Sequence, residues 1–322
     1  MNTQPIALVA DMGGTNVRFA LVDASLSCGK IQVLQVADHP TPFDAINAYL
    51  QSQELICPPL VGLAVACPAD GEEIIFTNSH WRFNKGALLS SLGCEELVVI
   101  NDFAALACGV PGLNREQLYQ IGGEAPLEDG NIAVLGPGTG VGVAGLLNHH
   151  GQWLPIAGEG GHIEWAPLDV LEREIQSLLV REFPRLSVER VMQGSGLALL
   201  YQTVCAIRGE TPATEQINRI TELGLAGEHA CCRETLRVYC NMLGSLAGDL
   251  SLVFGARGGV YIGGGIMPRL LEFVEHTELR QRFEHKGRMR AYNQRIPCFV
   301  ITAPLRALDG VVVVLRMRGL LH

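Results

Sequence analysis

Two glycine-rich segments of this 322-residue chain have the composition of anion-binding turns. The first reads Asp11-Met-Gly-Gly-Thr-Asn-Val-Arg18, and the second reads Gly136-Pro-Gly-Thr-Gly-Val-Gly142. Glycines have no Cβ, so backbone N–H groups can approach an anion closely, and a threonine hydroxyl adds a donor. The acid before the first turn can hold a hydrated Mg²⁺. Taken alone, that turn is explained equally well as a plain hairpin turn.

An acid that follows a buried apolar segment is the candidate general base. Asn101 and Asp102 come directly after the apolar residues 97–100. An acid at the carboxyl end of a strand can face a cleft and accept a proton from an attacking hydroxyl. The alternative is that the pair caps a following helix, because Asn and Asp both cap helices well.

Three further segments could contact a polyhydroxylated or flat ligand. Glu159 and His162 lie three residues apart among glycines, with neither an HExxH motif nor a nearby cysteine to favour a metal site. Glu189 lies near the start of an expected helix, where helix capping is the alternative role. The glycines at 263–265 permit close approach of a flat ligand or, equally, of a packed helix.

Other chemistries do not fit the sequence. Gly140, Gly142 and Gly145 match GxGxxG, but no helix is expected directly after them, so the dinucleotide fingerprint is rejected. The pair Gly29-Lys30 is followed by Ile31, so a Walker A motif is absent. A net charge of −9 argues against a general nucleic-acid binder. The basic run at 280–290 is interpreted as a solvated helical face.

The elements that must position these residues alternate between strands and helices. Strands are predicted at 5–11, 17–23, 31–37, 60–66, 73–77, 96–100, 131–135, 141–147, 260–262 and 298–301. Helices are predicted at 42–53, 85–92, 168–182, 196–207, 217–226 and 230–254. A strand–glycine turn–strand unit opens each half, which predicts two lobes.

The composition favours a cytoplasmic protein. The first ten residues contain no Lys or Arg, and no apolar run reaches the ~20 residues that span a bilayer. The ten cysteines show no CxxC spacing, so they are interpreted as reduced thiols. We therefore expect neither a membrane nor a nucleic acid among the partners.

The order of the motifs resembles that of the bacterial glucokinase family, which is related to hexokinases within the actin/Hsp70-like ATPase fold. The matching motifs are Asp-x-Gly-Gly-Thr-Asn-x-Arg, Asn-Asp, Gly-x-Gly-Thr-Gly-x-Gly, Gly-Glu-Gly-Gly-His, Ser-x-Glu-Arg and Gly-Gly-Gly-Ile. They run from Ile6 to Ile301. The chain is unlike the repressor-type sugar kinases, which carry a cysteine-rich zinc motif after Gly-Gly-His, because residues 163–167 read Ile-Glu-Trp-Ala-Pro here.

The resemblance implies a role for each matching residue. Asp102 would be the general base that takes the proton from the sugar 6-hydroxyl. Residues implied to bind the other sugar hydroxyls are Asn101, Glu159, His162 and Glu189. Those implied to hold ATP are Asp11, Gly13, Gly14 and Thr15 in a first phosphate loop, Gly136, Gly138, Thr139 and Gly140 in a second, and Gly264 and Gly265 against adenosine. Asp11 would lie near Mg²⁺ or its water shell.

The resemblance also implies a fold and an activity. The fold would be α/β, a two-lobed actin-like (ribonuclease H-like) ATPase with its active site in the interlobe cleft. The small lobe would comprise 1–112 plus 302–322, and the large lobe 113–301. The activity would be ATP- and Mg²⁺-dependent phosphorylation of D-glucose to glucose 6-phosphate by a homodimer. Alternatives are a kinase for another hexose and a catalytically weak, sugar-sensing regulator.

One segment departs from the family pattern. A Gly-rich turn usually precedes the final helix, but residues 303–314 read Ala-Pro-Leu-Arg-Ala-Leu-Asp-Gly-Val-Val-Val-Val. Four consecutive β-branched residues are unusual in a helix. The sequence therefore leaves the packing of this C-terminal helix open.

Overall fold

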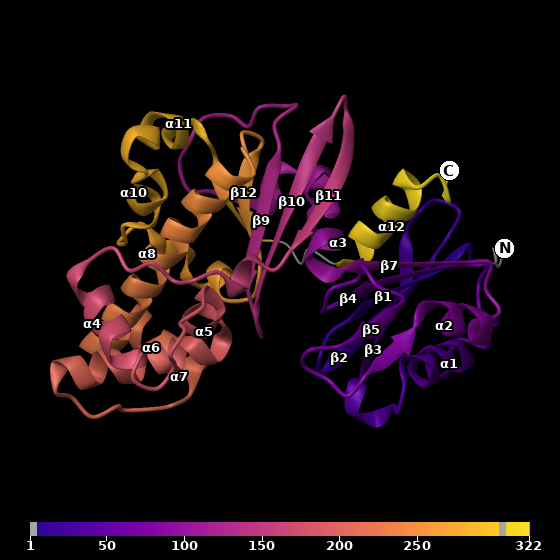
Figure 1. Ribbon diagram of the computed structural model, residues 1–322, viewed down its shortest axis with the longest axis horizontal. Coiled ribbons are helices and arrows are strands. Elements are labelled where there is room, and N and C mark those ends of the chain that lie inside the picture. Colours follow the sequence, from indigo (N-terminus) through magenta and orange to yellow (C-terminus); the bar gives the residue numbers. More distant parts are fainter. Residues whose placement is uncertain (1–4, 303–306, 322) are drawn as a thin grey trace. The chain divides into compact units, whose positions relative to one another are not determined.

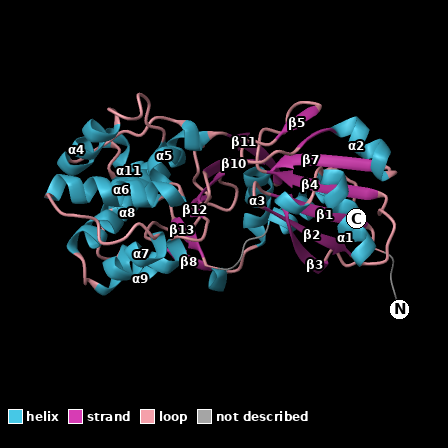
Figure 2. Ribbon diagram, turned by 90° about the horizontal axis from the view of Figure 1, so that it is seen from below, coloured by secondary structure: helices cyan, strands magenta, loops and turns pink. Residues whose placement is uncertain are grey.

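The computed structural model describes residues 5–302 and 307–321, and these form two compact units. The first unit groups 1–113, 152–157 and 304–322, and the second groups 114–151 and 158–303. Figures 1 and 2 show that each unit combines a β-sheet with helices. Residues 303–306 of the atypical C-terminal segment lie outside the described residues.

The first sheet has five strands in the order β3-β2-β1-β4-β7. Strand β1 pairs antiparallel with β2 and parallel with β4, and β4 pairs parallel with β7. The bounds are β1 Ala7–Met12, β2 Asn16–Val22, β3 Cys28–Gln35, β4 Leu60–Val65 and β7 Glu96–Asn101. The predicted hairpin meander with its Gly-Gly turn is therefore confirmed. Parallel strands β1, β4 and β7 bring their carboxyl ends to one edge of the sheet.

Helices of the first unit begin and end where the capping residues predict. Thr41 caps α1 (Pro42–Ser52) in a capping box with Asp44. Asn84 caps α2 (Lys85–Leu92), and Gly93 ends it with a left-handed φ of 66°. The other elements of this unit are α3 Asp102–Gly109, α12 Ala307–Met317 and the small hairpin β5 Glu73–Ile75 and β6 Arg82–Asn84.

The β-branched C-terminal segment forms helix α12, which packs against α3, β1 and β4. Val311 packs onto Gly62 of β4, where an added Cβ would come 2.4 Å from the valine Cγ1. Gly310 approaches α3 so closely that a Cβ there would lie 1.7 Å from the carbonyl oxygen of Ala105. Burial of these residues outweighs their weak intrinsic helix preference.

The second sheet has six strands in the order β11-β10-β9-β12-β13-β8. Strand β9 pairs antiparallel with β10 and parallel with β12, and β12 pairs parallel with β13. The bounds are β8 Leu118–Gln120, β9 Ile132–Pro137, β10 Val141–His149, β11 Gln152–Gly158, β12 Gly259–Ile262 and β13 Cys298–Ile301. The second predicted strand–turn–strand unit is confirmed.

The second unit also contains a group of helices (Figure 1). Their bounds are α4 Val170–Leu179, α5 Val188–Met192, α6 Gly194–Arg208, α7 Ile217–Ala226, α8 Ala230–Val253, α9 Leu271–Val274, α10 Leu279–Glu284 and α11 Arg290–Arg295. The long helix α8 contributes sixteen buried residues and forms the centre of the core.

The interpretation of the basic run at 280–290 as a solvated face is wrong for Arg282. Arg282 is only 6 % exposed and pairs with Asp169, Glu172 and Glu278. Its Nη2 lies 2.6 Å from Asp169 Oδ2 and 3.3 Å from Glu172 Oε1. A buried guanidinium needs such partners, because an isolated buried charge is strongly unfavourable. Arg282 therefore ties α10 to α4.

Candidate functional site

The first glycine turn closes the β1–β2 hairpin in the first unit. The N–H of Gly13 donates to the carbonyl of Asn16 at 3.0 Å. A Cβ on Gly14 would lie 2.7 Å from the carbonyl oxygen of Asn78, so only glycine fits beside that neighbouring segment. Thr15 follows with an exposed side chain. The turn is thus fixed by backbone packing and still presents a hydroxyl outward.

Asp11 is paired with Arg18 across this hairpin. The two residues face each other in the register of β1 and β2, and Arg18 Nη1 lies 3.0 Å from Asp11 Oδ2. Burial raises the pKa of Asp11, while the guanidinium acts in the opposite direction. One carboxylate and a nearby hydroxyl suit Mg²⁺, which is usually held by one or two carboxylates, phosphate oxygens and water.

Asn101 and Asp102 lie where β7 passes into α3. The Asn101 side chain caps α3 by accepting the Ala104 N–H at 3.1 Å, so the capping alternative is correct for Asn101. Asp102 is the first residue of that helix, and its Oδ1 accepts the Phe103 N–H at 2.8 Å and the Asn101 Nδ2–H at 3.2 Å. These two donors fix the orientation of the carboxylate at the helix N-terminus. The arrangement orients a proton acceptor.

The first-unit candidates share one edge of the five-stranded sheet. Asp11 pairs in register with Ala64, which pairs with Ile100, the residue before Asn101. Asp11 and Ile100 are therefore two strand spacings apart, which is about 10 Å at ~4.8 Å per strand. Asp11 and Asp102 therefore lie at the same edge of this sheet, where the carboxyl ends of β1 and β7 meet.

The second glycine turn joins β9 to β10 in the second unit. Within the turn, the Gly138 N–H donates to the Gly140 carbonyl at 2.7 Å, and Gly194 donates to the Gly138 carbonyl at 2.8 Å. Beyond the turn, the Val141 N–H donates to Glu189 Oε2 at 2.9 Å. A Cβ on Gly140 would lie 2.5 Å from that same oxygen. Helix α5 therefore braces the turn through one carboxylate.

Glu159, His162 and Glu189 come together in this unit. His162 lies between the two acids, with Nε2 at 3.9 Å from Glu159 Oε2 and Nδ1 at 4.0 Å from Glu189 Oε1. The side chains of Glu159 and His162 are half exposed, whereas that of Glu189 is 26 % exposed. Gly161 brings the segment against β10, because its Cβ would lie 2.0 Å from the Val141 carbonyl. Two acceptors and an imidazole thus lie beside the second glycine turn.

The glycines after β12 have different environments. Gly264 has a φ of +90°, and a Cβ there would lie 2.2 Å from the carbonyl oxygen of Pro137 at the end of β9. Nothing lies within 4 Å of a Cβ built on Gly265. Gly264 is therefore required by backbone packing, and Gly265 leaves space that a flat ring can occupy.

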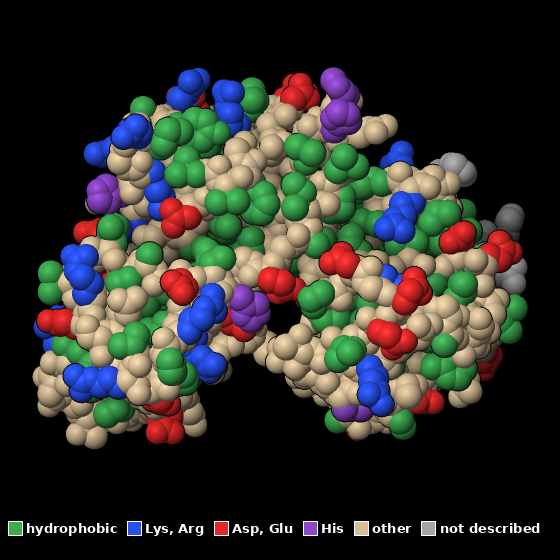
Figure 3. All heavy atoms as spheres, viewed as in Figure 1, with side chains coloured by type: hydrophobic (Ala, Val, Ile, Leu, Met, Phe, Trp, Pro, Cys, Tyr) green, Lys and Arg blue, Asp and Glu red, His purple; other side chains and the backbone are tan. Residues whose placement is uncertain are grey.

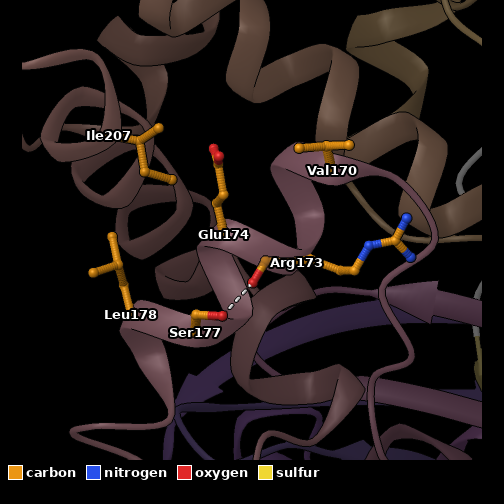
Figure 4. A pocket seen from close by; sticks show the side chains of 6 residues that line it. All are labelled: Val170, Arg173, Glu174, Ser177, Leu178 and Ile207. Atoms are coloured by element: carbon orange, nitrogen blue, oxygen red, sulfur yellow. Dashed lines mark hydrogen bonds between the residues drawn. The ribbon is translucent and has the colours of Figure 1, made fainter.

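A pocket of about 430 Å³ lies elsewhere in the second unit, along α4 and the end of α6 (Figure 4). It is lined by Val170, Arg173, Glu174, Ser177, Leu178 and Ile207. None of the predicted site residues contributes to it. The predicted site residues therefore lie at the glycine turns and strand ends and not in this pocket.

The described surface and helices add two observations. On the face drawn in Figure 3, Lys and Arg side chains are interspersed with Asp and Glu, so the described side chains form no continuous basic track there. Among residues 5–302 and 307–321, no helix is both long and apolar enough to cross a bilayer.

Comparison with known proteins decides the family. The glucokinase family model matches residues 8–318. The chain is 44 % identical to a glucokinase of Chromobacterium violaceum over 304 residues, which cover 94 % of this chain and 87 % of that protein. This chain belongs to the glucokinase family. A glucokinase of Hahella chejuensis is 40 % identical, with 98 % of each chain covered.

Solved structures agree with this glucokinase assignment. A glucokinase from an Antarctic psychrotroph has a TM-score of 0.85 and 37 % identity, covering 96 % of this chain and 98 % of its own. A ROK-family glucokinase from Streptomyces griseus, solved with glucose and AMPPNP, shares the fold at a TM-score of 0.62 and 18 % identity. The predicted actin-like ATPase fold is confirmed.

The sequence predicts no role for one residue that contacts the candidate site. This residue is Arg18, which ends the first glycine-rich motif. A hairpin with a three-residue turn at 13–15 sets Asp11 opposite Arg18, so the register alone could have identified the pair. The Asp11 carboxylate, which is the candidate Mg²⁺ ligand, thus has the Arg18 guanidinium beside it.

Proposed function

We infer that this glucokinase transfers the γ-phosphoryl group of ATP to the 6-hydroxyl of D-glucose. The observation that carries the inference is Asp102, a carboxylate oriented by two N–H donors at the N-terminus of α3. Phosphoryl transfer needs positioning, charge neutralisation and a base for the attacking hydroxyl. Asp102 is the base, and the hydroxyl proton passes to its carboxylate as the oxygen attacks phosphorus.

The remaining candidates bind the two substrates. The sugar hydroxyls interact with Asn101, Glu159, His162 and Glu189. The phosphates interact with the turns at 13–15 and 136–140, and adenosine lies against Gly264 and Gly265. Mg²⁺ neutralises phosphate charge when bound, with Asp11 as its protein partner. Arg18 holds that carboxylate in place by pairing with it at 3.0 Å.

An ADP-release assay with Mg-ATP over a panel of hexoses tests this proposal. Glucose should give the highest kcat/KM, with mannose, fructose and N-acetylglucosamine as competitors. Higher turnover with another hexose would establish the alternative hexose kinase. Glucose binding without turnover on any sugar would instead establish the sugar-sensing regulator.

Glu159→Ala should raise the KM for glucose about tenfold or more, because hydrogen bonds to a charged group contribute about 1.5–3 kcal/mol. The KM for ATP should stay within about twofold, since no backbone group depends on this half-exposed side chain in the described contacts. Steady-state kinetics with each substrate varied provide the test. Glu164→Ala, which removes a 78 %-exposed acid two residues past His162, is the matched control. An unchanged glucose KM in Glu159→Ala would remove this residue from the sugar site.

Glu189→Ala should affect both substrates. Its carboxylate accepts the Val141 N–H at 2.9 Å and also lies 4.0 Å from His162 Nδ1. Losing it should raise the KM values for ATP and for glucose, each by about tenfold, since an N–H at the phosphate turn loses a charged acceptor. Glu182→Ala, an exposed acid before α5, should change neither value. A rise in the glucose KM alone would show that Glu189 does not brace the turn.

We also propose that the enzyme is a cytoplasmic homodimer, as expected for this family. Light scattering on the purified chain should give twice the mass of 34.7 kDa. A monomeric mass at micromolar concentration would contradict the dimer and leave the catalytic proposal intact.

A further inference from the structure

Three metal-ligating side chains meet where α6 ends and α8 begins, in the second unit. One ligand atom each of Glu210, His229 and Cys231 lie within 4.8 Å of one another. Glu210 follows α6 directly after Gly209, while His229 caps α8 and Cys231 lies in its first turn. None of these residues has a role in the phosphoryl transfer described above.

The backbone on both sides of this cluster is fixed. Gly209 ends α6 with a φ of 69°, and the Glu210 N–H donates to the Cys205 carbonyl at 2.9 Å. Three residues further on, the Ala213 N–H donates to the Tyr201 hydroxyl at 2.9 Å. The Glu228 N–H donates to the Leu223 carbonyl at 3.0 Å. The ligand-bearing positions are therefore held in place before any ion binds, which reduces the entropy cost of binding.

Cys231 and Glu210 already interact. The Cys231 Sγ lies 3.3 Å from Glu210 Oε2, so the thiol donates to the carboxylate. Burial raises the pKa of this thiol to about 12, and the carboxylate beside it acts in the same direction. Cys231 is 1 % exposed, whereas Glu210 is exposed. A buried thiol thus lies directly beneath an exposed carboxylate.

His229 completes the set. Its Nδ1 accepts the Cys232 N–H at 3.4 Å, a long distance for a capping bond. The Tyr201 ring lies edge-on to the imidazole, with ring centroids 5.8 Å apart. Arg208, the residue before Gly209, is already paired, because its Nε donates to Glu234 Oε2 at 2.8 Å. Its charge is therefore balanced by an acid outside the cluster.

We propose that Glu210, His229 and Cys231 bind a Zn²⁺ ion. A thiolate, an imidazole and a carboxylate are the ligand types that Zn²⁺ takes, with water in the fourth tetrahedral position. Mg²⁺ and Ca²⁺ prefer oxygen ligands alone. Bond lengths of about 2.0–2.3 Å require ligand atoms roughly 3.5 Å apart. The ligand atoms now lie within 4.8 Å of one another, so small side-chain movements are enough. The exposed Glu210 and the half-buried His229 can make these movements toward the fixed sulfur of Cys231.

Binding replaces the S–H bond of Cys231 by a sulfur–zinc bond, and the proton leaves to solvent. The ion links the end of α6 to the start of α8 across the segment that contains α7. Its effect is on the stability of the second unit, because an ion that binds only the folded chain stabilises it. This role is independent of the catalytic proposal.

The test uses tag-free, full-length protein that has been stripped of metal by a chelator. Titration with Co²⁺ should produce a thiolate-to-cobalt charge-transfer band that saturates at one ion per chain. Zn²⁺ should abolish the band and raise Tm. Cys231→Ser should remove the band. His229→Gln and Glu210→Gln should each weaken Zn²⁺ binding at least about tenfold, the smallest loss that even an outer-shell change causes.

Two controls separate this cluster from other metal-binding groups. Cys28→Ser removes a half-buried thiol of the first unit. His150→Gln disrupts an exposed histidine pair whose rings lie 4.5 Å apart. Both variants should keep the band and the Zn²⁺-dependent rise in Tm. Absence of a charge-transfer band in the wild type, or its persistence in Cys231→Ser, would overturn the proposal. Glu210→Gln changes an exposed side chain, so its result does not depend on core packing.

Discussion

Replacing Asp102 with alanine should lower kcat for glucose at least ~100-fold, the usual scale for losing a general base. Glucose affinity, measured by calorimetry, should remain detectable. The physical reason is that Oδ1 of this carboxylate is oriented by the Phe103 N–H and the Asn101 amide at the start of α3. Without it, the attacking hydroxyl loses the carboxylate that we propose takes its proton.

Asp102→Asn separates the chemical role from a structural one. The amide oxygen of asparagine can still accept the Phe103 N–H at the helix N-terminus, but it cannot act as a base. We therefore expect an equally large fall in kcat with an unchanged Tm. Asp129→Ala, which removes an exposed acid, serves as the control. Near-normal turnover in Asp102→Asn would refute the assignment of the base.

Gly310→Ala should lower the free energy of unfolding by at least about 1–3 kcal/mol, the usual cost of overpacking. The added Cβ would come 1.7 Å from the Ala105 carbonyl oxygen and 2.4 Å from its carbon, so α12 and α3 must move apart. Because α3 begins at Asp102, activity should fall as well. Urea denaturation and a thermal melt measure the effect.

Gly112→Ala is the matched control for this helix contact. Gly112 is exposed, and nothing lies within 4 Å of a Cβ built on it. The same chemical change should therefore alter the free energy of unfolding by less than about 0.5 kcal/mol. Equal stability of the two variants would show that α12 does not pack on α3 as described.

Local chemistry made much of the fold predictable. Helix α2 has the bounds that Asn84 and Gly93 indicate, and α7 begins and ends at the predicted residues 217 and 226. Both helices end at a left-handed glycine, Gly93 and Gly227, and the Asn84 side chain caps the start of α2. The strand–glycine turn–strand units were predictable for a similar reason, because a glycine turn between two apolar runs favours a hairpin.

Elements that depend on tertiary contacts were harder to predict. Strand β11 was missed, since its half-exposed sequence includes Pro155 and carries little apolar periodicity. Arg282 was expected in solvent, but three acids from two segments surround it. The four valines of α12 were doubtful by propensity alone, and the small residues Gly62 and Gly310 make their packing possible.

The candidate site was predictable as a set of residues but not as a set of contacts. The structure brings Glu159, His162 and Glu189 together, although nothing in their spacing required it. It also shows that Glu189 accepts an N–H at the second turn, which connects the residues proposed to bind the sugar to those proposed to bind phosphate. Such a contact joins positions 48 residues apart and is invisible to a local reading of the sequence.

The most direct test of the central claim is to identify the product. The protein should be incubated with Mg-ATP and glucose, and ADP and glucose 6-phosphate should be measured in the same reaction, the latter through its specific dehydrogenase. The account predicts equal amounts of the two products, and neither product above background with 6-deoxyglucose. ADP formation from glucose without glucose 6-phosphate would contradict transfer to the 6-hydroxyl. Phosphorylation of 6-deoxyglucose, seen as ADP above background, would contradict it as well.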